Sequence, residues 1–345
     1  MKRIKIFTLF FISVAMALAG CTGGGAEGGS GTDRIVLAAY TTPREAYGQL
    51  IPLFQSQWLA ETGRRVVFEE SYLGSGAQSR AVVEGFEADI VALSLAADVN
   101  RIKQAGLITH DWQQNDHNGF VTTSVVAFAV RKGNPLQIQD WSDLRRPGIE
   151  ILTPNPKMSG GAMWNILGAY GAALRGQIDG IPGEDPEAAM MLLKDILRNV
   201  SVMDQSARDS IVNYEMGIGD LAITYENEVL VGMNSGQDYE LILPASTILI
   251  ENPIAIVDVN VDKHGSREVT EAFLDFLLTP EAQAIFAQHG LRVVNPEAAA
   301  ASAEFYPEID DLFTVDFFVG WDQVMIEIFG DGGLYDQVLL QVHRR

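Results

Sequence analysis

The sequence has little that would support cross-linking, nucleic-acid binding or catalysis by a common motif. Its 345 residues contain one cysteine, Cys21, which excludes an intramolecular disulfide and a thiolate metal cluster. The formal net charge is −21 and no long basic run offsets it, which excludes a nucleic-acid groove. The sequence has no phosphate loop GxxxxGK[ST], Gly-x-Ser-x-Gly elbow or His-Glu-x-x-His helix. Hydrophobic residues make up 47%, which is enough for a packed core in two or three domains or two lobes.

The first twenty residues have the pattern of a secretory signal. Three basic residues among the first five precede an apolar run over 6–18, which is too short for a membrane span of about 20 residues. The run ends in Leu-Ala-Gly-Cys21, which resembles the bacterial lipobox, in which the cysteine is acylated and becomes the mature N-terminus. We expect a signal peptide over 1–20, then a lipidated Cys21 and a Gly-rich tether over 21–33. The alternative is an uncleaved anchor or an unlipidated secreted protein.

Beyond the tether, strand-like and helix-like stretches alternate, which predicts an α/β fold with largely parallel sheets. Two long extended runs, 122–131 and 246–257, stand apart from the short strands and could link two lobes as crossovers. The predicted strands are 35–40, 66–68, 90–95, 122–131, 149–153, 200–203, 221–224 and 246–257, and the predicted helices are 45–62, 79–86, 98–105, 162–174, 187–198, 207–216, 270–289 and 317–329.

Three places share one local pattern, in which a strand ends, a serine appears beside glycine or alanine, and a helix begins. They are Ser75, with Gln78 at capping-box spacing, Ser159 before Gly160-Gly161, and Ser206 before Asp209. Free N–H groups and the helix dipole make such a start a possible anion site. Serine is also a favoured N-cap in any helix, so each place taken alone favours a structural role, and only the three together favour an anion site.

Other polar groups point less clearly to chemistry. His110, Asp111, Asp116 and His117 could hold a metal in principle, but their turn-rich segment favours a solvated loop. Glu226 and Glu228 could form an acid/base pair or simply complement a helix dipole. We therefore expect no metal and no cofactor.

Several strings in one order resemble the sulfate- and thiosulfate-binding proteins of bacterial ABC importers. These are the AYTTPRE string at 39–45, GSG at 74–76, TPNPKMSGGAMWN at 153–165, GIGD at 217–220 and YENE at 225–228. The resemblance covers about residues 34–340. It implies an α/β, periplasmic-binding-protein-like (type II) clamshell with discontinuous lobes: lobe I from 34–121 plus 254–345, and lobe II from 122–253.

The resemblance also implies a ligand site between the lobes, made of backbone N–H groups and a few side-chain donors. Thr41 stands where many relatives have aspartate, Tyr225 where relatives often have tryptophan, and Ala77 where lysine is common. The implied ligand residues are Thr41 and Ser75 from lobe I and Ser159, Gly160, Gly161, Ala207 and Tyr225 from lobe II, with Arg44 and Arg208 as possible supporting residues.

A cleft made of donors suits a fully ionised dianion, because hydrogen phosphate would bury an unpaired O–H. We expect a monomeric, membrane-anchored lipoprotein outside the cytoplasm that binds sulfate or thiosulfate and delivers it to an ABC permease, without enzymatic activity. The alternatives are a binding protein for molybdate or phosphate and an extracytoplasmic hydrolase that uses Glu226 or Glu228.

Overall fold

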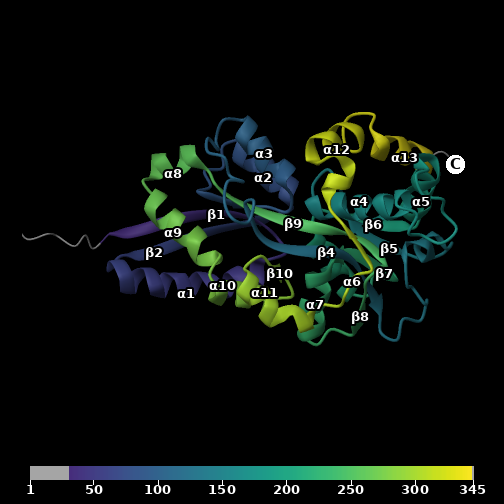
Figure 1. Ribbon diagram of the computed structural model, residues 1–345, viewed down its shortest axis with the longest axis horizontal. Coiled ribbons are helices and arrows are strands. Elements are labelled where there is room, and N and C mark those ends of the chain that lie inside the picture. Colours follow the sequence, from purple (N-terminus) through teal and green to yellow (C-terminus); the bar gives the residue numbers. More distant parts are fainter. Residues whose placement is uncertain (1–30, 344–345) are drawn as a thin grey trace, which may run out of the picture.

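The computed structural model describes residues 31–343, which form two α/β lobes joined by two long strands (Figure 1). Lobe I lies at the N-terminal end and lobe II at the opposite end of the long axis. The linking strands are β4 (Phe120–Arg131) and β9 (Ser246–Ile256). Both runs were predicted from the sequence as extended segments, and both are confirmed.

The elements of lobe I come from two separate stretches of the chain. They are β1 (Thr32–Tyr40), α1 (Arg44–Thr62), β2 (Arg65–Leu73), α2 (Ser75–Val83), β3 (Ile90–Ala92) and α3 (Ala96–Gln104), then α8 (Asp258–His264), α9 (Arg267–Leu277), α10 (Pro280–Gln288), β10 (Arg292–Val293) and α11 (Pro296–Ser302).

Lobe II is built mainly from the central stretch. Its elements are the 3₁₀ helix η1 (Trp141–Arg145), β5 (Ile151–Pro154), α4 (Gly160–Leu174), α5 (Pro186–Arg198), β6 (Val200–Asp204), α6 (Ala207–Glu215), β7 (Leu221–Tyr225), α7 (Glu226–Asn234) and β8 (Tyr239–Ile242). The C-terminal stretch adds β11 (Asp311–Phe313), the 3₁₀ helix η3 (Val315–Phe318), α12 (Trp321–Glu327) and α13 (Leu334–His343). Before them, the 3₁₀ helix η2 (Ala303–Phe305) follows α11 and contacts it.

One hydrogen-bonded path runs through both lobes in the order β2-β1-β3-β9-β4-β7-β5-β6. Pairing is parallel for β1 with β2 and β3 and for β5 with β6 and β7, whereas β4 and β9 pair antiparallel with each other and with β7 and β3. Each long strand therefore belongs to both lobes. The α/β fold predicted from the alternation is confirmed.

Strand β1 shows why the parallel sheet is buried on both faces. Its residues Ile35 to Tyr40 are a continuous apolar run, each at most 4% exposed. Ile35, Leu37 and Ala39 pack into a core with α1, α9 and α10, while Val36 and Ala38 pack into the core that includes α2 and α3. Such a run, rather than strict alternation, is the pattern of a strand covered by helices on both sides.

Two of the predicted helices are each divided into two shorter elements, so both predictions are wrong in extent. The predicted helix over 270–289 is two helices, α9 and α10, with Pro280 opening the second, because proline fits the first turn of a helix and not its interior. The predicted helix over 317–329 is η3 followed by α12, because Val319 adopts a left-handed backbone with φ of 65°.

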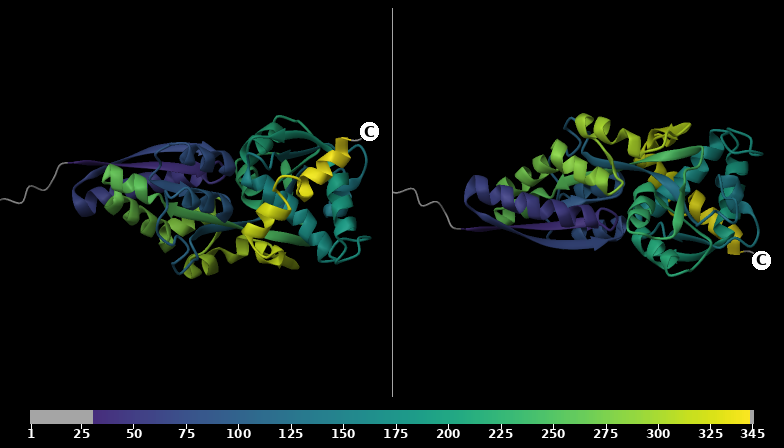
Figure 2. Two further views of the ribbon diagram at one scale, coloured as in Figure 1. Left: turned by 90° about the horizontal axis from the view of Figure 1, so that it is seen from above. Right: turned by 90° about the horizontal axis from the view of Figure 1, so that it is seen from below.

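The C-terminal segment returns to the far lobe (Figure 2). Strand β11 pairs with residues 246–248 of β9, and α13 packs against α5. We therefore propose that lobe II includes the residues from 311 onward, in contrast to the boundary expected from the sequence.

The signal peptide, Cys21 and most of the tether fall outside the described residues, and β1 begins at Thr32, inside the segment expected as tether. Among the helices over 31–343, none is long and apolar enough to cross a membrane.

Candidate functional site

The starts of three helices of lobe II touch one another through small residues. A β-carbon added to Gly161, in the first turn of α4, would lie 3.3 Å from the hydroxyl of Tyr225 and 3.4 Å from the β-carbon of Ala207. Ala207 opens α6, and Tyr225 precedes α7. Because the first N–H groups of a helix lack intrahelical partners, this junction gathers unpaired donors at the positive ends of helix dipoles.

The start of α2 in lobe I closes over this junction. The N–H of Ala77 donates to the carbonyl of Met158 at 3.2 Å. A β-carbon on Gly74 would lie only 2.7 Å from each of the carbonyl oxygens of Met158 and Gln205. These two residues directly precede the serines at the starts of α4 and α6, so the lobes are in contact at the candidate site.

The three serines predicted from the local pattern behave differently. Ser206 accepts a hydrogen bond from the N–H of Asp209 and is a conventional cap. Ser159 is at the N-cap and 3% exposed, yet its hydroxyl makes no capping bond. Ser75 is not the cap, because Gly74 holds that position, so the predicted capping box with Gln78 is wrong.

The hydroxyl of Ser75 is already used within lobe I. It donates to a carboxylate oxygen of Asp98 at 2.6 Å and accepts from the N–H of Ser94 at 3.0 Å. A hydroxyl has one hydrogen to give, so Ser75 can offer a ligand only its backbone N–H.

Arg208 of lobe II links the two lobes through an ion pair with a glutamate of lobe I. Its guanidinium donates to both carboxylate oxygens of Glu45, at 2.5 and 2.9 Å, and to the carbonyl of Thr42 at 3.3 Å. Its Nε lies 2.8 Å from the carboxylate of Glu228, whose side chain is 1% exposed. Burial raises the pKa of Glu228, while Arg208 opposes that rise. Arg208 therefore neutralises a buried acid next to Ala207 and ties α6 to the start of α1.

The remaining two predicted residues lie at the edge of this arrangement. Thr41 is half-buried and directly precedes Thr42, so it lies next to the contact with Arg208. Arg44 is exposed, and its guanidinium lies 5.2 Å from the ring centroid of Tyr72 in lobe I.

The two acids considered as a catalytic pair are engaged separately. Glu226 forms a two-bond ion pair with Arg292, at 2.7 and 2.9 Å, and Glu228 faces Arg208. The two glutamates are two positions apart on α7, a spacing that points side chains in different directions. Each is neutralised by its own arginine, which does not suit an acid/base pair.

The polar segment around His110 is also engaged in structure. The ring Nδ1 of His110 is 2.7 Å from a carboxylate oxygen of Asp258. Within residues 31–343, no group of three or more His, Cys, Asp or Glu side chains is placed to hold a metal ion.

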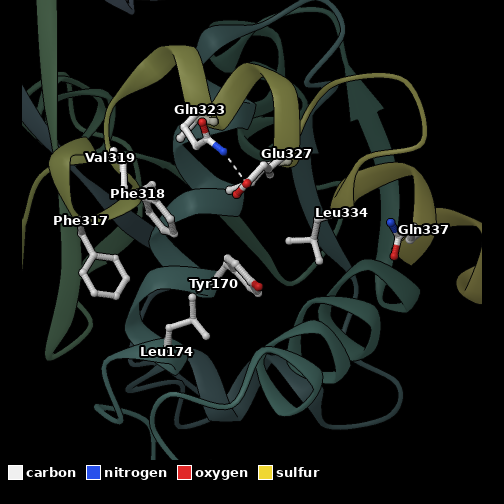
Figure 3. Close-up of a pocket in the computed structure, with 11 residues that line it drawn as sticks. Tyr170, Leu174, Phe317, Phe318, Val319, Gln323, Glu327, Leu334 and Gln337 are labelled. Atoms are coloured by element: carbon white, nitrogen blue, oxygen red, sulfur yellow. Dashed lines mark hydrogen bonds between the residues drawn. The ribbon is translucent and has the colours of Figure 1, made fainter.

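A cavity of about 660 Å³ lies elsewhere, between α4 and the C-terminal segment (Figure 3). Tyr170, Leu174, Phe318 and Leu334 line it, together with a hydrogen-bonded pair of polar residues, Gln323 and Glu327. None of the predicted ligand residues borders it.

Ser94 is the residue at the junction that sequence reasoning missed. It follows β3, is 1% exposed, and its hydroxyl is 2.6 Å from that of Tyr225. The signal was present, because Ser94 is a small polar residue between a strand and the helix that begins at Ala96, as at the three serines above.

Comparison with known proteins places this chain among bacterial solute-binding proteins. Residues 35–292 match the family model described as bacterial extracellular solute-binding protein. The chain is 43% identical to the sulfate-binding protein of Synechococcus elongatus, over 94% of this chain and 93% of the relative. It is 33% identical to the thiosulfate-binding protein of Pseudomonas aeruginosa, over 98% and 99%.

Solved structures agree on the fold. The sulfate-binding protein SubI from Mycobacterium tuberculosis H37Rv is similar with a TM-score of 0.78 and 34% identity, covering 86% of this chain and all of that one. The periplasmic binding protein P5PA is similar with a TM-score of 0.64 at 20% identity, covering 90% and 99%, and supports the two-lobed binding-protein fold.

Proposed function

The chain belongs to the family of bacterial extracellular solute-binding proteins, and from this membership we propose that it binds sulfate or thiosulfate between its lobes. The observation that carries the proposal is the convergence of the starts of α2, α4, α6 and α7, whose free N–H groups favour an anion. Thr41, Ser75, Ser159, Gly160, Gly161, Ala207 and Tyr225 are the proposed ligand residues, with Arg208 supporting them from the side.

The proposed site relies on oriented dipoles rather than on a free positive charge. Arg208, the cation beside Ala207, is neutralised by Glu45 and Glu228, so it adds little net charge for a ligand. Backbone N–H groups can stabilise an anion in a buried cleft without a counterion. The remote acidic charge of the protein is screened within about 8 Å at physiological salt.

A panel of oxyanions tests the proposal directly. The described domain, purified without the first thirty residues, is titrated by calorimetry with sulfate, thiosulfate, molybdate and hydrogen phosphate. We expect tight binding of sulfate or thiosulfate and much weaker binding of hydrogen phosphate, whose proton finds few acceptors among N–H donors. Preference for molybdate or phosphate, or turnover of a phosphate or sulfate ester, would replace this proposal by one of its alternatives.

We propose that the protein has no enzymatic role and delivers its ligand, as a monomer, to an ABC permease in the membrane. The separate pairing of Glu226 with Arg292 and of Glu228 with Arg208 supports a role without acid/base chemistry.

We further propose that a lipid at Cys21 anchors the protein. Strand β1 runs from Thr32 to Tyr40, so at about 3.3 Å per residue its first residue lies about 26 Å from Tyr40, next to the proposed ligand residue Thr41. A tether attached there leaves the cleft free. Cys21→Ser is expected to move the protein from the membrane fraction to the soluble fraction, because stable anchoring requires acyl chains. A mature-length Cys21→Ser chain that still sediments with membranes would disprove the anchor.

A further inference from the structure

Ser94 is held in one orientation by three neighbours. Its N–H donates to the hydroxyl of Ser75, and its carbonyl accepts from the indole N–H of Trp164 at 3.0 Å and from the amide of Asn252 at 3.3 Å. Trp164 lies on α4 of lobe II, and Asn252 lies on the crossover strand β9. The N–H and the carbonyl of Ser94 are thus both hydrogen-bonded. These bonds fix the backbone at Ser94 and therefore the direction in which its side chain leaves the backbone.

That side chain points at the hydroxyl of Tyr225. The two oxygens are 2.6 Å apart, and either can donate. The two hydroxyls carry two hydrogens, and one of these lies between them. The other hydrogen needs a different acceptor, because a buried unpaired donor costs about 1–3 kcal/mol.

The hydroxyl pair lies against the glycine turn that opens α4. A β-carbon on Gly160 would be 2.6 Å from the Ser94 hydroxyl oxygen, and one on Gly161 would be 3.3 Å from that of Tyr225. The free hydroxyl hydrogen therefore lies beside the N–H groups that we propose bind the anion. Burial raises the pKa of Tyr225, so its phenol keeps its proton and can donate at neutral pH.

We propose that Ser94 is a positioning residue for the oxyanion: its hydroxyl donates to Tyr225, which turns the phenolic O–H of Tyr225 toward the bound anion. This inference rests on the proposed function, because it assigns a role within the same site. The direction of donation follows from the ligand: an anion accepts only, so Tyr225 can donate to it only if Ser94 supplies the hydrogen between the two oxygens. A phenol that accepts one hydrogen bond is also a stronger donor in the next.

A four-protein cycle tests this role: the parent, Ser94→Ala, Tyr225→Phe and the double variant, each titrated with sulfate by calorimetry. We expect about a tenfold loss of affinity in each single variant, as for one hydrogen bond to a charged group. The double variant is expected to bind as weakly as Tyr225→Phe and no weaker, because Ser94 acts only through Tyr225.

A control separates positioning from a general packing effect. Ser79 is a fully buried serine of the same lobe whose hydroxyl donates to the carbonyl of Asp98 at 2.7 Å, one helical turn beyond Ser75. Ser79→Ala is expected to lower the melting temperature as Ser94→Ala does, but to leave sulfate affinity within about twofold of the parent.

The outcomes distinguish this inference from the function on which it rests. A parent that binds no sulfate or thiosulfate overturns both. If the parent binds sulfate and Ser94→Ala binds it equally well, or if the losses of the two single variants add in the double variant, the positioning role is wrong and the proposed function stands.

Discussion

At the scale of single residues, Ser159 is the side chain with the clearest unused capacity to bind. It is buried at the N-cap of α4 without capping that helix. A hydrogen bond from its hydroxyl to a dianion would contribute about 1.5–3 kcal/mol. Ser159→Ala is therefore expected to weaken sulfate binding by about 10–150-fold, measured by calorimetry well below the melting temperature.

The absence of a capping bond provides a control for this prediction. Because the Ser159 hydroxyl caps nothing, its removal should change the melting temperature little, whereas Ser206→Ala removes a real cap and should cost about 1 kcal/mol. Unchanged affinity in a stable Ser159→Ala protein would take this hydroxyl out of the site.

Arg208 should matter for stability as well as for the site. Arg208→Met leaves the buried Glu228 without its counterion, and removal of one partner of a buried pair costs about 3–5 kcal/mol. Glu45→Gln removes the more exposed partner and should cost about 1 kcal/mol or less. Thermal unfolding of the two variants, without ligand, compares these losses.

The loss of stability caused by Arg208→Met should depend on pH, in a direction that the pKa of Glu228 fixes. The pKa of Glu228 is already raised in the folded protein, and loss of Arg208 raises it further. A carboxyl whose folded pKa exceeds its unfolded value stabilises the fold at low pH and loses that contribution as pH rises above about 4.3. The variant should therefore lose more of the parent's free energy of unfolding at pH 7 than at pH 4.5. A deficit independent of pH would show that Glu228 is not the cause.

At the scale of elements, the break between η3 and α12 carries a strained residue. Val319 has φ of 65° and is 83% exposed. A β-branched residue in the left-handed region costs about 1–2 kcal/mol, and asparagine tolerates that region better. Val319→Asn is expected to raise the melting temperature by about 2 °C.

Val259, an exposed valine inside α8, supplies the matched comparison for this prediction. It has an ordinary helical backbone, so Val259→Asn relieves no strain and should not raise the melting temperature. Equal effects of the two substitutions would show that strain at Val319 is not the reason.

At the scale of the whole molecule, Gly74 governs whether the lobes can meet. Its backbone, with φ of −58° and ψ of 139°, suits any residue, so Gly74→Ala should leave lobe I intact. A β-carbon there would lie 2.7 Å from two carbonyl oxygens of lobe II, which cannot move aside as a flexible side chain can. We expect a loss of sulfate affinity of at least tenfold, with the ligand-free melting temperature unchanged.

Small-angle scattering shows whether Gly74→Ala acts by blocking closure. Sulfate should reduce the radius of gyration of the parent, because donors from both lobes can meet one small anion only when the cleft is shut. The same reduction should be smaller or absent in Gly74→Ala. Gly48→Ala, at an open position on α1, should behave as the parent. A parent whose radius does not change with sulfate contradicts the closure.

The sequence by itself determined the main strands and several of the helices, although it placed the start of α2 four residues late and joined α9 to α10. Apolar runs such as Ile35 to Tyr40 identify strands covered on both faces, and glycine or serine at the end of a strand identifies a helix start, because these are local consequences of burial and backbone freedom. The two long strands were also recognisable, since length is a local property. Resemblance to a family then supplied the candidate ligand residues that no spacing rule could rank.

Only the tertiary structure decided which of these groups face one another. Ser75 and Ser159 look alike in sequence, yet the first hydroxyl is bonded to Asp98 and the second caps nothing, because their neighbours come from distant parts of the chain. Ser94 meets Tyr225 across 131 positions, and α13 packs on α5 rather than on lobe I. Side-chain pairing across lobes depends on how the sheet path crosses between them, and a local pattern carries no information about that crossing.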